Sequence, residues 1–307
     1  MLEFKNYKEL MAKLSDEKVC REAMEMWRWN GEPFCPHCGG TKPYKLKDGK
    51  TYRCREKSCR KDFTVTVGTI FENSKIPLST WIASIFVITA HKKGISSLQL
   101  GRDLGITQKT AWFILHRIRF IMDEPNPEPL DNIVELDETY AGGKFANMNR
   151  GRRKKYQALG IDNKTAVMGF VEREGKGRLT VIGEDSFKDV VRKNVKKEAT
   201  VITDQHAGYK GLGEEYAAHL SVNHSEMQFR DGLAYTNSVE GFFSCLKRSL
   251  IGIYHSASPK HLQKYCNETA YRYNTRKISD KERFTHTMCN VEGRLTYNKL
   301  IEKNQKK

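Results

Sequence analysis

The second half of the chain carries regular apolar patterns that predict strands and helices. A period of two, typical of a strand, runs through residues 132–144, whereas residues 186–197 and 236–248 repeat their apolar residues with a helical period. The expected elements are strands at 132–144, 164–174 and 177–186, a helix at 186–197, strands at 199–204 and 219–225, and a helix at 236–248. Strands that alternate with helices predict an α/β domain over residues 133–295.

The segment before this domain is helical in pattern. Residues 78–94 are apolar around the whole helix and predict one buried helix. Residues 95–119 predict two helices joined by a turn at Gly105 and Ile106, which the apolar side chains would pack together, namely Leu98, Leu104, Ile106, Ala111, Trp112 and Leu115. This pattern resembles a helix-turn-helix. The residues that open its second helix would face the DNA major groove, namely Thr107, Gln108, Lys109 and Thr110. An ordinary helical hairpin is the alternative.

The composition divides the chain into five parts. Residues 1–75 are rich in cysteine and turns, residues 76–123 are the helical region, and residues 124–132 are a proline-rich linker. The α/β domain over 133–295 follows, and residues 296–307 form a polar tail. We therefore expect a multidomain protein.

The charge of the chain points to a polyanionic partner. The formal net charge is +16 over 307 residues, and lysine and arginine are spread along the whole length. Such a surface suits DNA or RNA. The longest apolar run, residues 81–90, is too short for a membrane span, and the first residues lack the pattern of a signal peptide. We expect a cytoplasmic protein without a membrane partner, whose eight cysteines do not form disulfides.

Four of the cysteines have the spacing of a zinc site. Cys35 and Cys38 are separated by two residues, Cys54 and Cys59 by four, and fifteen residues separate the two pairs. Two such pairs can close a tetrahedral shell around a structural Zn2+, which supplies folding energy to a small module. His37 is expected to be an exposed loop residue. The remaining cysteines are expected in the core: Cys20, Cys245, Cys266 and Cys289.

Three carboxylates lie on three different expected elements of the α/β domain. Asp137 is in the first strand, Asp204 ends a later strand, and Glu240 is in the helix over 236–248. Carboxylates placed in this way can converge on two Mg2+ or Mn2+ ions and serve phosphoryl transfer. The alternative for Asp204 is a turn residue after its strand.

The first strand also carries two other acidic residues. Alternation places Glu135 on the same face as Asp137 and Glu138 on the opposite face, so we expect one ligand from the neighbouring pair. Glu135 is expected to be solvated or to support the ligands indirectly. His224 is a candidate for a hydrogen bond near the metals, with a structural histidine as the alternative.

The helix over 236–248 has an apolar stripe beside a polar stripe. Glu240 in the polar stripe is either a metal ligand or the partner of Asn237 in a capping box. Lys247 lies two turns later on the same face, about 10 Å along the axis, and is placed to meet a DNA phosphate with the help of Arg248. The alternative for Lys247 is a surface lysine.

Together these motifs resemble a known family. They include CPHC, LDETYAGGK, VITDQHAGY, TNSVEGFFSCLKR and YRYNTR, and the similarity covers nearly the whole chain. The chain resembles the DDE transposases of bacterial insertion sequences that carry an N-terminal zinc ribbon, the ISXO-type group, which is related to Merlin transposons. The basic segment over 147–157 looks like a variable insert, and nothing is transferred to it.

The resemblance implies a fold and a function. It implies a ribonuclease-H-like catalytic domain, a catalytic triad of Asp137, Asp204 and Glu240, and a helper at Lys247. It further implies a nucleoid-associated enzyme that acts on double-stranded DNA as a homodimer or larger assembly. The zinc ribbon and helix-turn-helix would bind the terminal inverted repeats. Two alternatives stay open: a non-catalytic DNA-binding regulator, and a nuclease of the same fold that cuts without joining strands.

Overall fold

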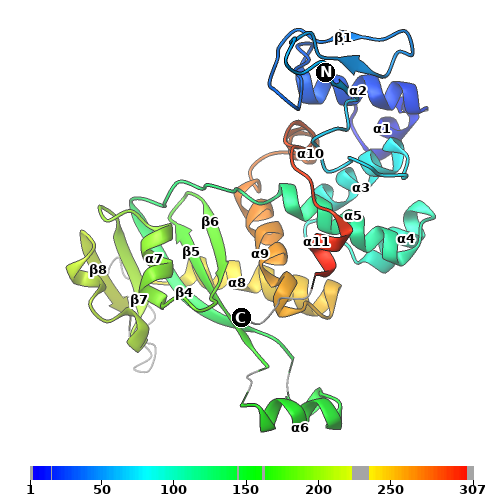
Figure 1. The fold of residues 1–307 in the computed structure, drawn as a ribbon. Coiled ribbons are helices and arrows are strands. Elements are labelled where there is room, and N and C mark those ends of the chain that lie inside the picture. The colour runs from blue at the N-terminus through cyan, green and yellow to red at the C-terminus, as the bar shows by residue number, and fades with distance from the viewer. Residues whose placement is uncertain (1–2, 15, 144, 161–162, 223–234, 303–307) are drawn as a thin grey trace. The chain divides into compact units, whose positions relative to one another are not determined.

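The computed structural model describes residues 3–14, 16–143, 145–160, 163–222 and 235–302 (Figure 1). These residues form two compact units, each described here by itself. Unit 1 spans Met1–Met122 together with Lys277–Lys307, and unit 2 spans Asp123–Arg276. Within the described residues, no helix has the length and apolar character needed to cross a membrane.

Unit 1 contains a small three-stranded antiparallel sheet and most of the helices. Its elements are α1 (Tyr7–Lys13), α2 (Glu17–Trp29), β1 (Tyr44–Lys45), β2 (Tyr52–Arg53), β3 (Asp62–Phe63), α3 (Leu78–Ala90), α4 (Ser97–Leu104), α5 (Gln108–Ile121), α10 (Asp280–Cys289) and α11 (Tyr297–Ile301). The order of strands in the sheet is β1-β2-β3. Trp29 at the end of α2 packs on Tyr52 and Phe63, which gives the sheet a small aromatic core.

The last two helices pack in unit 1. Phe284 of α10 is fully buried and contacts the aromatic rings of Phe4, Trp27 and Phe86. This packing explains why unit 2 ends at Arg276, before the boundary at residue 295 that the pattern suggested. The segment expected as a polar tail contains α11, whose Leu300 is 1% exposed.

Helices α4 and α5 are joined by the expected turn. Gly105 ends α4 with a φ of 65°, and Thr107 begins α5 by accepting a hydrogen bond from the Thr110 amide. Leu98 is 51% exposed, so the expectation that it packs between the helices was wrong; Leu100, two residues later, is the buried leucine of α4. Leu98 is the second residue of α4, and the apolar pattern alone did not show that its side chain faces outward.

Unit 2 is built around a five-stranded mixed sheet. Its elements are β4 (Ile133–Ala141), η1 (Phe145–Asn147), α6 (Arg150–Ala158), β5 (Thr165–Glu172), β6 (Gly177–Val181), α7 (Phe187–Asn194), β7 (Thr200–Asp204), η2 (Ala207–Tyr209), η3 (Leu212–Glu214), β8 (Ala218–Val222), α8 (Asn237–Ser249), the π-helical segment η5 (Leu250–Tyr254) and α9 (Pro259–Asn274). The strand order is β6-β5-β4-β7-β8. β4 pairs antiparallel with β5 and parallel with β7.

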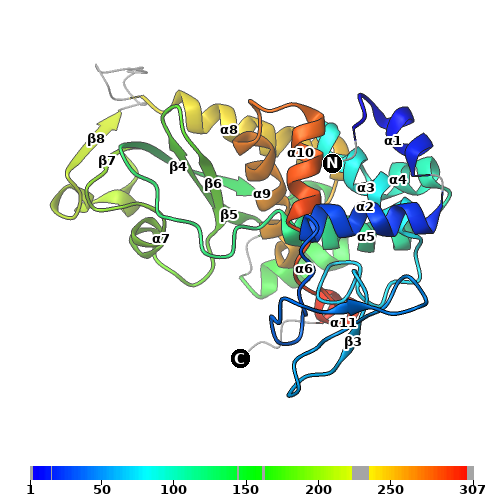
Figure 2. The same ribbon diagram turned by 90° about the horizontal axis from the view of Figure 1, so that it is seen from above.

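Helices cover both faces of this sheet, as Figure 2 shows for α7 and α8. Val190 and Val191 of α7 pack with Val134 and Leu136 on one face. Phe242 and other apolar residues of α8 pack with α9 on the opposite face. Alternating strands and helices were expected over this region, and the segment expected as a linker adds Leu130, which is buried beside Val195.

Candidate active site and zinc ribbon

The four cysteines with metal-ligand spacing come together in unit 1. The Sγ atoms of Cys35 and Cys59 are 3.8 Å apart, those of Cys38 and Cys54 are 3.5 Å apart, and all four lie within 4.8 Å of one another. A tetrahedral zinc site with Zn–S bonds of about 2.3 Å places its sulfurs about 3.8 Å apart. The donor set and spacing therefore fit a structural Zn2+.

The other cysteine expectations hold in part. Cys20 and Cys266 are buried, as expected for small core residues. Cys245 and Cys289 are exposed, because each lies on the outward face of its helix, so the core assignment was wrong for both. His37 is exposed and is not part of the cysteine cluster.

Three carboxylates converge at one edge of the large sheet. Oxygen atoms of Asp137, Glu138 and Asp204 all lie within 4.8 Å of one another. The parallel pairing of β4 with β7 ends at Glu135 and Ile202. Asp137 and Asp204 each lie two residues beyond that last pair, so the register of the sheet brings them level.

Glu138 joins this cluster although alternation places it on the other face of β4. The Tyr209 hydroxyl, from the α7 face, donates a hydrogen bond of 2.7 Å to Glu138. Because β7 no longer pairs with β4 here, both acidic side chains can reach the open edge. Glu138 is therefore within reach of the same cluster as Asp137, and the expectation that one of the two is a metal ligand stays a prediction.

His206 and Tyr209, which follow Asp204 in the chain, complete this side of the site. The Asp204 carboxylate accepts a hydrogen bond from the His206 amide, and His206 Nε2 lies 3.8 Å from Glu138. Burial, followed by the Glu138 charge, raises the pKa of Tyr209, which keeps its hydroxyl protonated as a donor. The segment DQHAGY supplies these residues, and its position directly after a strand was the available sequence signal.

Glu240 lies near this cluster but is not part of it. The pKa of Asp137 is raised to about 7, first by burial and then by the charges of neighbouring carboxylates, including Glu240; the amide hydrogen bond from Glu138 acts in the lowering direction. The third predicted carboxylate is therefore close enough for its charge to act on Asp137. A cation bound among these groups would relieve their repulsion.

The start of α8 differs from the capping box considered for Glu240. The residue before the helix is Thr236, and it makes no side-chain cap hydrogen bond. A box from Thr236 would need its acidic partner at Val239, whereas Glu240 is one residue further on. The proposed box between Asn237 and Glu240 is therefore wrong.

Glu135 caps the helix instead. Its carboxylate accepts hydrogen bonds from the amides of Ser238 and Val239, at 2.8 and 3.2 Å, and from the Ser238 hydroxyl at 3.0 Å. Its side chain is fully buried, so the first alternative, a solvated residue, was wrong, whereas indirect support of the ligands stays a prediction. A negative charge at a helix N-terminus also interacts favourably with the helix dipole.

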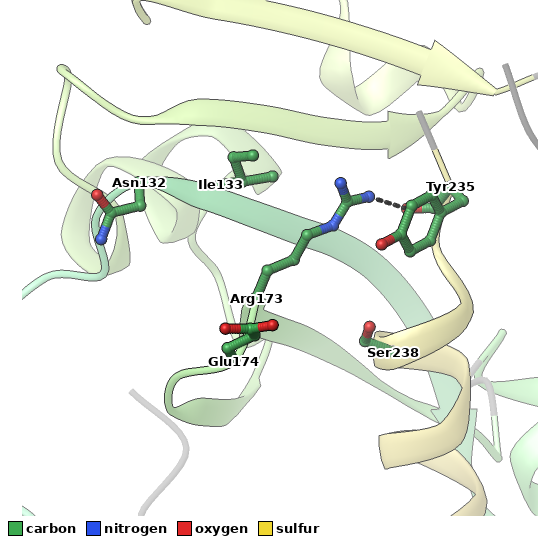
Figure 3. A pocket seen from close by; sticks show the side chains of 6 residues that line it. All are labelled: Asn132, Ile133, Arg173, Glu174, Tyr235 and Ser238. Carbon is green, nitrogen blue, oxygen red and sulfur yellow. Dashed lines mark hydrogen bonds between the residues drawn. The ribbon is translucent and has the colours of Figure 1, made fainter. Parts of the chain in front are cut away.

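Arg173 balances the buried charge of Glu135. Its Nε lies 2.9 Å from Glu135, and Figure 3 shows its guanidinium reaching the Tyr235 carbonyl, which accepts a hydrogen bond at 3.2 Å. The guanidinium also lies 3.6 Å from the centre of the Tyr235 ring. A cavity of about 350 Å3 beside this pair is lined by Asn132, Ile133, Arg173, Glu174, Tyr235 and Ser238.

Gly169 allows α8 to approach the sheet beside the site. It pairs with Asp137 in the β4–β5 register. A Cβ at this position would lie 2.7 Å from Phe243 and 2.8 Å from Val239. Because Gly169 has no side chain, the helix that carries Glu240 can lie close to the strand that carries Asp137.

The predicted DNA-binding residues are available on the surface of their own units. Lys247 and Arg248 are exposed in the last turn of α8. Thr107, Gln108 and Lys109 are exposed at the start of α5, and Thr110 is half-buried. His224 lies outside the described residues.

The comparisons with known proteins agree with this arrangement. Residues 129–274 match the ISXO2-like transposase domain, and residues 15–62 match the transposase zinc-ribbon domain. A protein of Halobacterium salinarum described as "Uncharacterized protein in transposable element ISH50" is 24% identical over 248 residues. The match covers 76% of this chain and 83% of that protein.

The two matched domains and the relative from a transposable element support a transposase function. The chain therefore contains a segment similar to the transposase zinc-ribbon domain, followed by a segment similar to the ISXO2-like transposase domain. Transposase domains imply DNA binding.

Proposed function

We propose that this transposase binds the terminal inverted repeats of its insertion sequence and catalyses metal-dependent strand cleavage and strand transfer. The observation that carries the proposal is the convergence of Asp137, Glu138 and Asp204, with Glu240 nearby, inside the matched transposase domain. The sheet order β6-β5-β4-β7-β8 supports a ribonuclease-H-like fold for unit 2.

The donor set fits a divalent cation that prefers oxygen ligands. Asp137, Asp204 and Glu240 would hold Mg2+ or Mn2+, and the carboxylate of Glu138 is within reach of the first two. When bound, such a cation supplies Lewis acidity and charge neutralisation to phosphoryl transfer. The raised pKa of Asp137 supports this assignment, because crowded carboxylates favour a bound cation.

The protein groups around the carboxylates keep them in place. Tyr209 orients Glu138 through its hydroxyl, and the His206 amide orients Asp204. Glu135 holds the first turn of α8, which carries Glu240. A site whose ligands are held before substrate arrives loses little energy to reorganisation during the reaction.

DNA recognition is assigned to both units. We propose that the zinc ribbon and the α4–α5 hairpin bind the terminal repeats, with Thr107, Gln108, Lys109 and Thr110 toward the bases. Lys247 and Arg248 would contact phosphates that lead into the active site. Two element ends react together, so a homodimer or larger assembly on DNA is part of the proposal.

A strand-joining assay tests the proposal. Pre-cut element ends and a supercoiled target plasmid are incubated with the protein and Mg2+ or Mn2+, and the plasmid is sequenced across new junctions. Joined products that disappear with Asp137→Asn support strand transfer. Hydrolysis of the ends without joined product would leave a nuclease, and binding without either reaction would leave a DNA-binding regulator.

A further inference from the structure

The insert between β4 and β5 is strongly cationic. Residues 142–164 contain seven lysines and arginines and one aspartate. Five of the cations lie in α6: Arg150, Arg152, Arg153, Lys154 and Lys155. No residue of α6 is buried. The helix therefore covers no hydrophobic core, and packing does not explain its cationic composition.

The cations of α6 lack acidic partners within the part of the chain that the structure describes. None of the five lies within 4.0 Å of a described carboxylate. Arg152 instead contacts Tyr156, through a hydrogen bond of 3.1 Å and a stacked guanidinium. Helix α7 of the same unit differs, since its Arg192 and Lys193 each pair with carboxylates. The cationic charge of α6 is therefore left for an external partner.

The helix also has little stability of its own. A helix of nine residues is marginal in isolation. Arg150 and Arg152 in its first turn oppose the helix dipole, and the like charges of Arg150 and Lys154, four residues apart, cost about 0.2–0.5 kcal/mol. A polyanion bound along the helix would remove each of these costs. The physical chemistry of α6 thus favours a bound polyanion.

A groove lies beside α6. It has a volume of about 500 Å3 and is lined on one side by Asn147, Arg152 and Tyr156 and on the other by Ser258 and Pro259 at the start of α9. Figure 1 shows α6 beyond the ends of β4 and β5. From Asp137, β4 continues for four residues to Ala141, which is about 13 Å along the strand.

We propose that α6 and its groove bind the phosphate backbone of duplex DNA without reading sequence, near the reacting phosphodiester. The distance of about 13 Å along β4 corresponds to about four base pairs. The inference rests on the proposed function in one respect, which is that the bound DNA is the DNA that reacts. Backbone binding itself follows from the exposed helix and from its cations, which have no acidic partner among the described residues.

The test compares two full-length variants that lose the same charge. Arg153→Gln/Lys154→Gln/Lys155→Gln removes three of the five positive charges of α6. Lys188→Gln/Lys193→Gln/Lys197→Gln removes three positive charges from α7 and the residues that follow it. Binding to a labelled duplex is measured from 50 to 300 mM NaCl without divalent metal. Each phosphate contact contributes about 0.9 to the slope of log affinity against log salt, so the α6 variant should lose about 2–3 from the slope. The α7 variant should keep the wild-type slope.

A second measurement needs no variant. Acetylation of lysines in the wild-type protein, read by mass spectrometry, should show protection of Lys154 and Lys155 by DNA, while Lys193 and Lys197 stay reactive. An α6 variant that keeps the wild-type slope, or lysines in α6 that DNA does not protect, would overturn the inference. Cleavage is absent from both measurements. Strand joining with an unchanged α6 slope would refute only this inference, and a reduced slope without cleavage would refute only the proposed reaction.

Discussion

The Ser238 amide donates a hydrogen bond of 2.8 Å to the Glu135 carboxylate. Glu135 lies two residues before Asp137 in β4, and Ser238 lies two residues before Glu240 in α8. This one contact therefore links the strand and the helix that carry two of the proposed metal ligands. Glu135 is fully buried and forms an ion pair with Arg173. Its charge therefore contributes to this link between β4 and α8 in addition to its hydrogen bonds.

Glu135→Gln should destabilise the protein by about 3–5 kcal/mol. The variant keeps a hydrogen-bond acceptor for Ser238 but removes the negative charge of the buried ion pair with Arg173. Urea unfolding at neutral pH measures the change. Glu174→Gln, in the exposed turn that follows Arg173, is the matched control and should change stability by less than about 0.5 kcal/mol. A loss below about 1 kcal/mol for Glu135→Gln would contradict the role of the buried ion pair with Arg173.

Gly169→Ala should displace α8 and weaken activity. The added methyl group would lie within 2.8 Å of Phe243 and Val239, and such overpacking costs about 1–3 kcal/mol. The second substitution Phe243→Leu should restore part of the stability by making room. Gly183→Ala, where a Cβ would meet nothing within 4 Å, is the control for thermal unfolding. Equal melting temperatures for the two alanine variants would show that α8 does not need the close approach.

The contribution of Asp137 to the stability of the metal-free protein should fall as the pH rises from about 4 to about 7. Asp137 has a pKa of about 7 in the folded protein and 3.8 as the ordinary value, so the folded state binds more protons between these limits. Its ionisation therefore costs stability, by up to about 4 kcal/mol at pH 8. Asp137→Asn should remove this dependence and be more stable than the wild type at pH 8. Unfolding curves across the pH range, with metal removed by chelation, provide the measurement, and a pH profile unchanged by the substitution would contradict the assignment.

The purified protein should contain one zinc ion per chain, held by the four clustered cysteines. Cys54→Ser should lose that zinc and unfold the small sheet of unit 1, whose core is little more than the cluster of Trp29, Tyr52 and Phe63. Metal analysis and tryptophan fluorescence report the two effects. Cys289→Ser changes an exposed thiol outside the cluster and should keep its zinc. Full zinc content in Cys54→Ser would refute the site.

Local pattern was enough to predict most elements of unit 2 and the cysteine site. The segments expected as strands became β4 to β8, and the paired cysteine spacing became a compact cluster, because both signals lie within short stretches of chain. The apolar stripe of α8 was likewise visible, and Val239, Phe242 and Leu246 are buried as a stripe requires.

Contacts between distant segments could not be predicted in this way. Glu135 looks like any acidic residue in a half-buried strand, since its partner amide is 103 residues away. Gly169 looks like a weak point in a strand until the approach of Phe243 is known. The approach of Glu138 to Asp204 depends on where the pairing of β4 with β7 stops, which alternation within one strand does not reveal.

The central claim is that the carboxylates of unit 2 hold the catalytic metal, and Glu240→Gln tests it most directly. Glu240 is exposed and does not cap its own helix, so the variant should fold and bind element-end DNA as the wild type does. Its metal-dependent cleavage of that DNA, followed as single-turnover product formation, should fall by at least about 100-fold, because a ligand charge is lost. Cleavage by the folded, DNA-bound variant at a rate near that of the wild type would contradict the account.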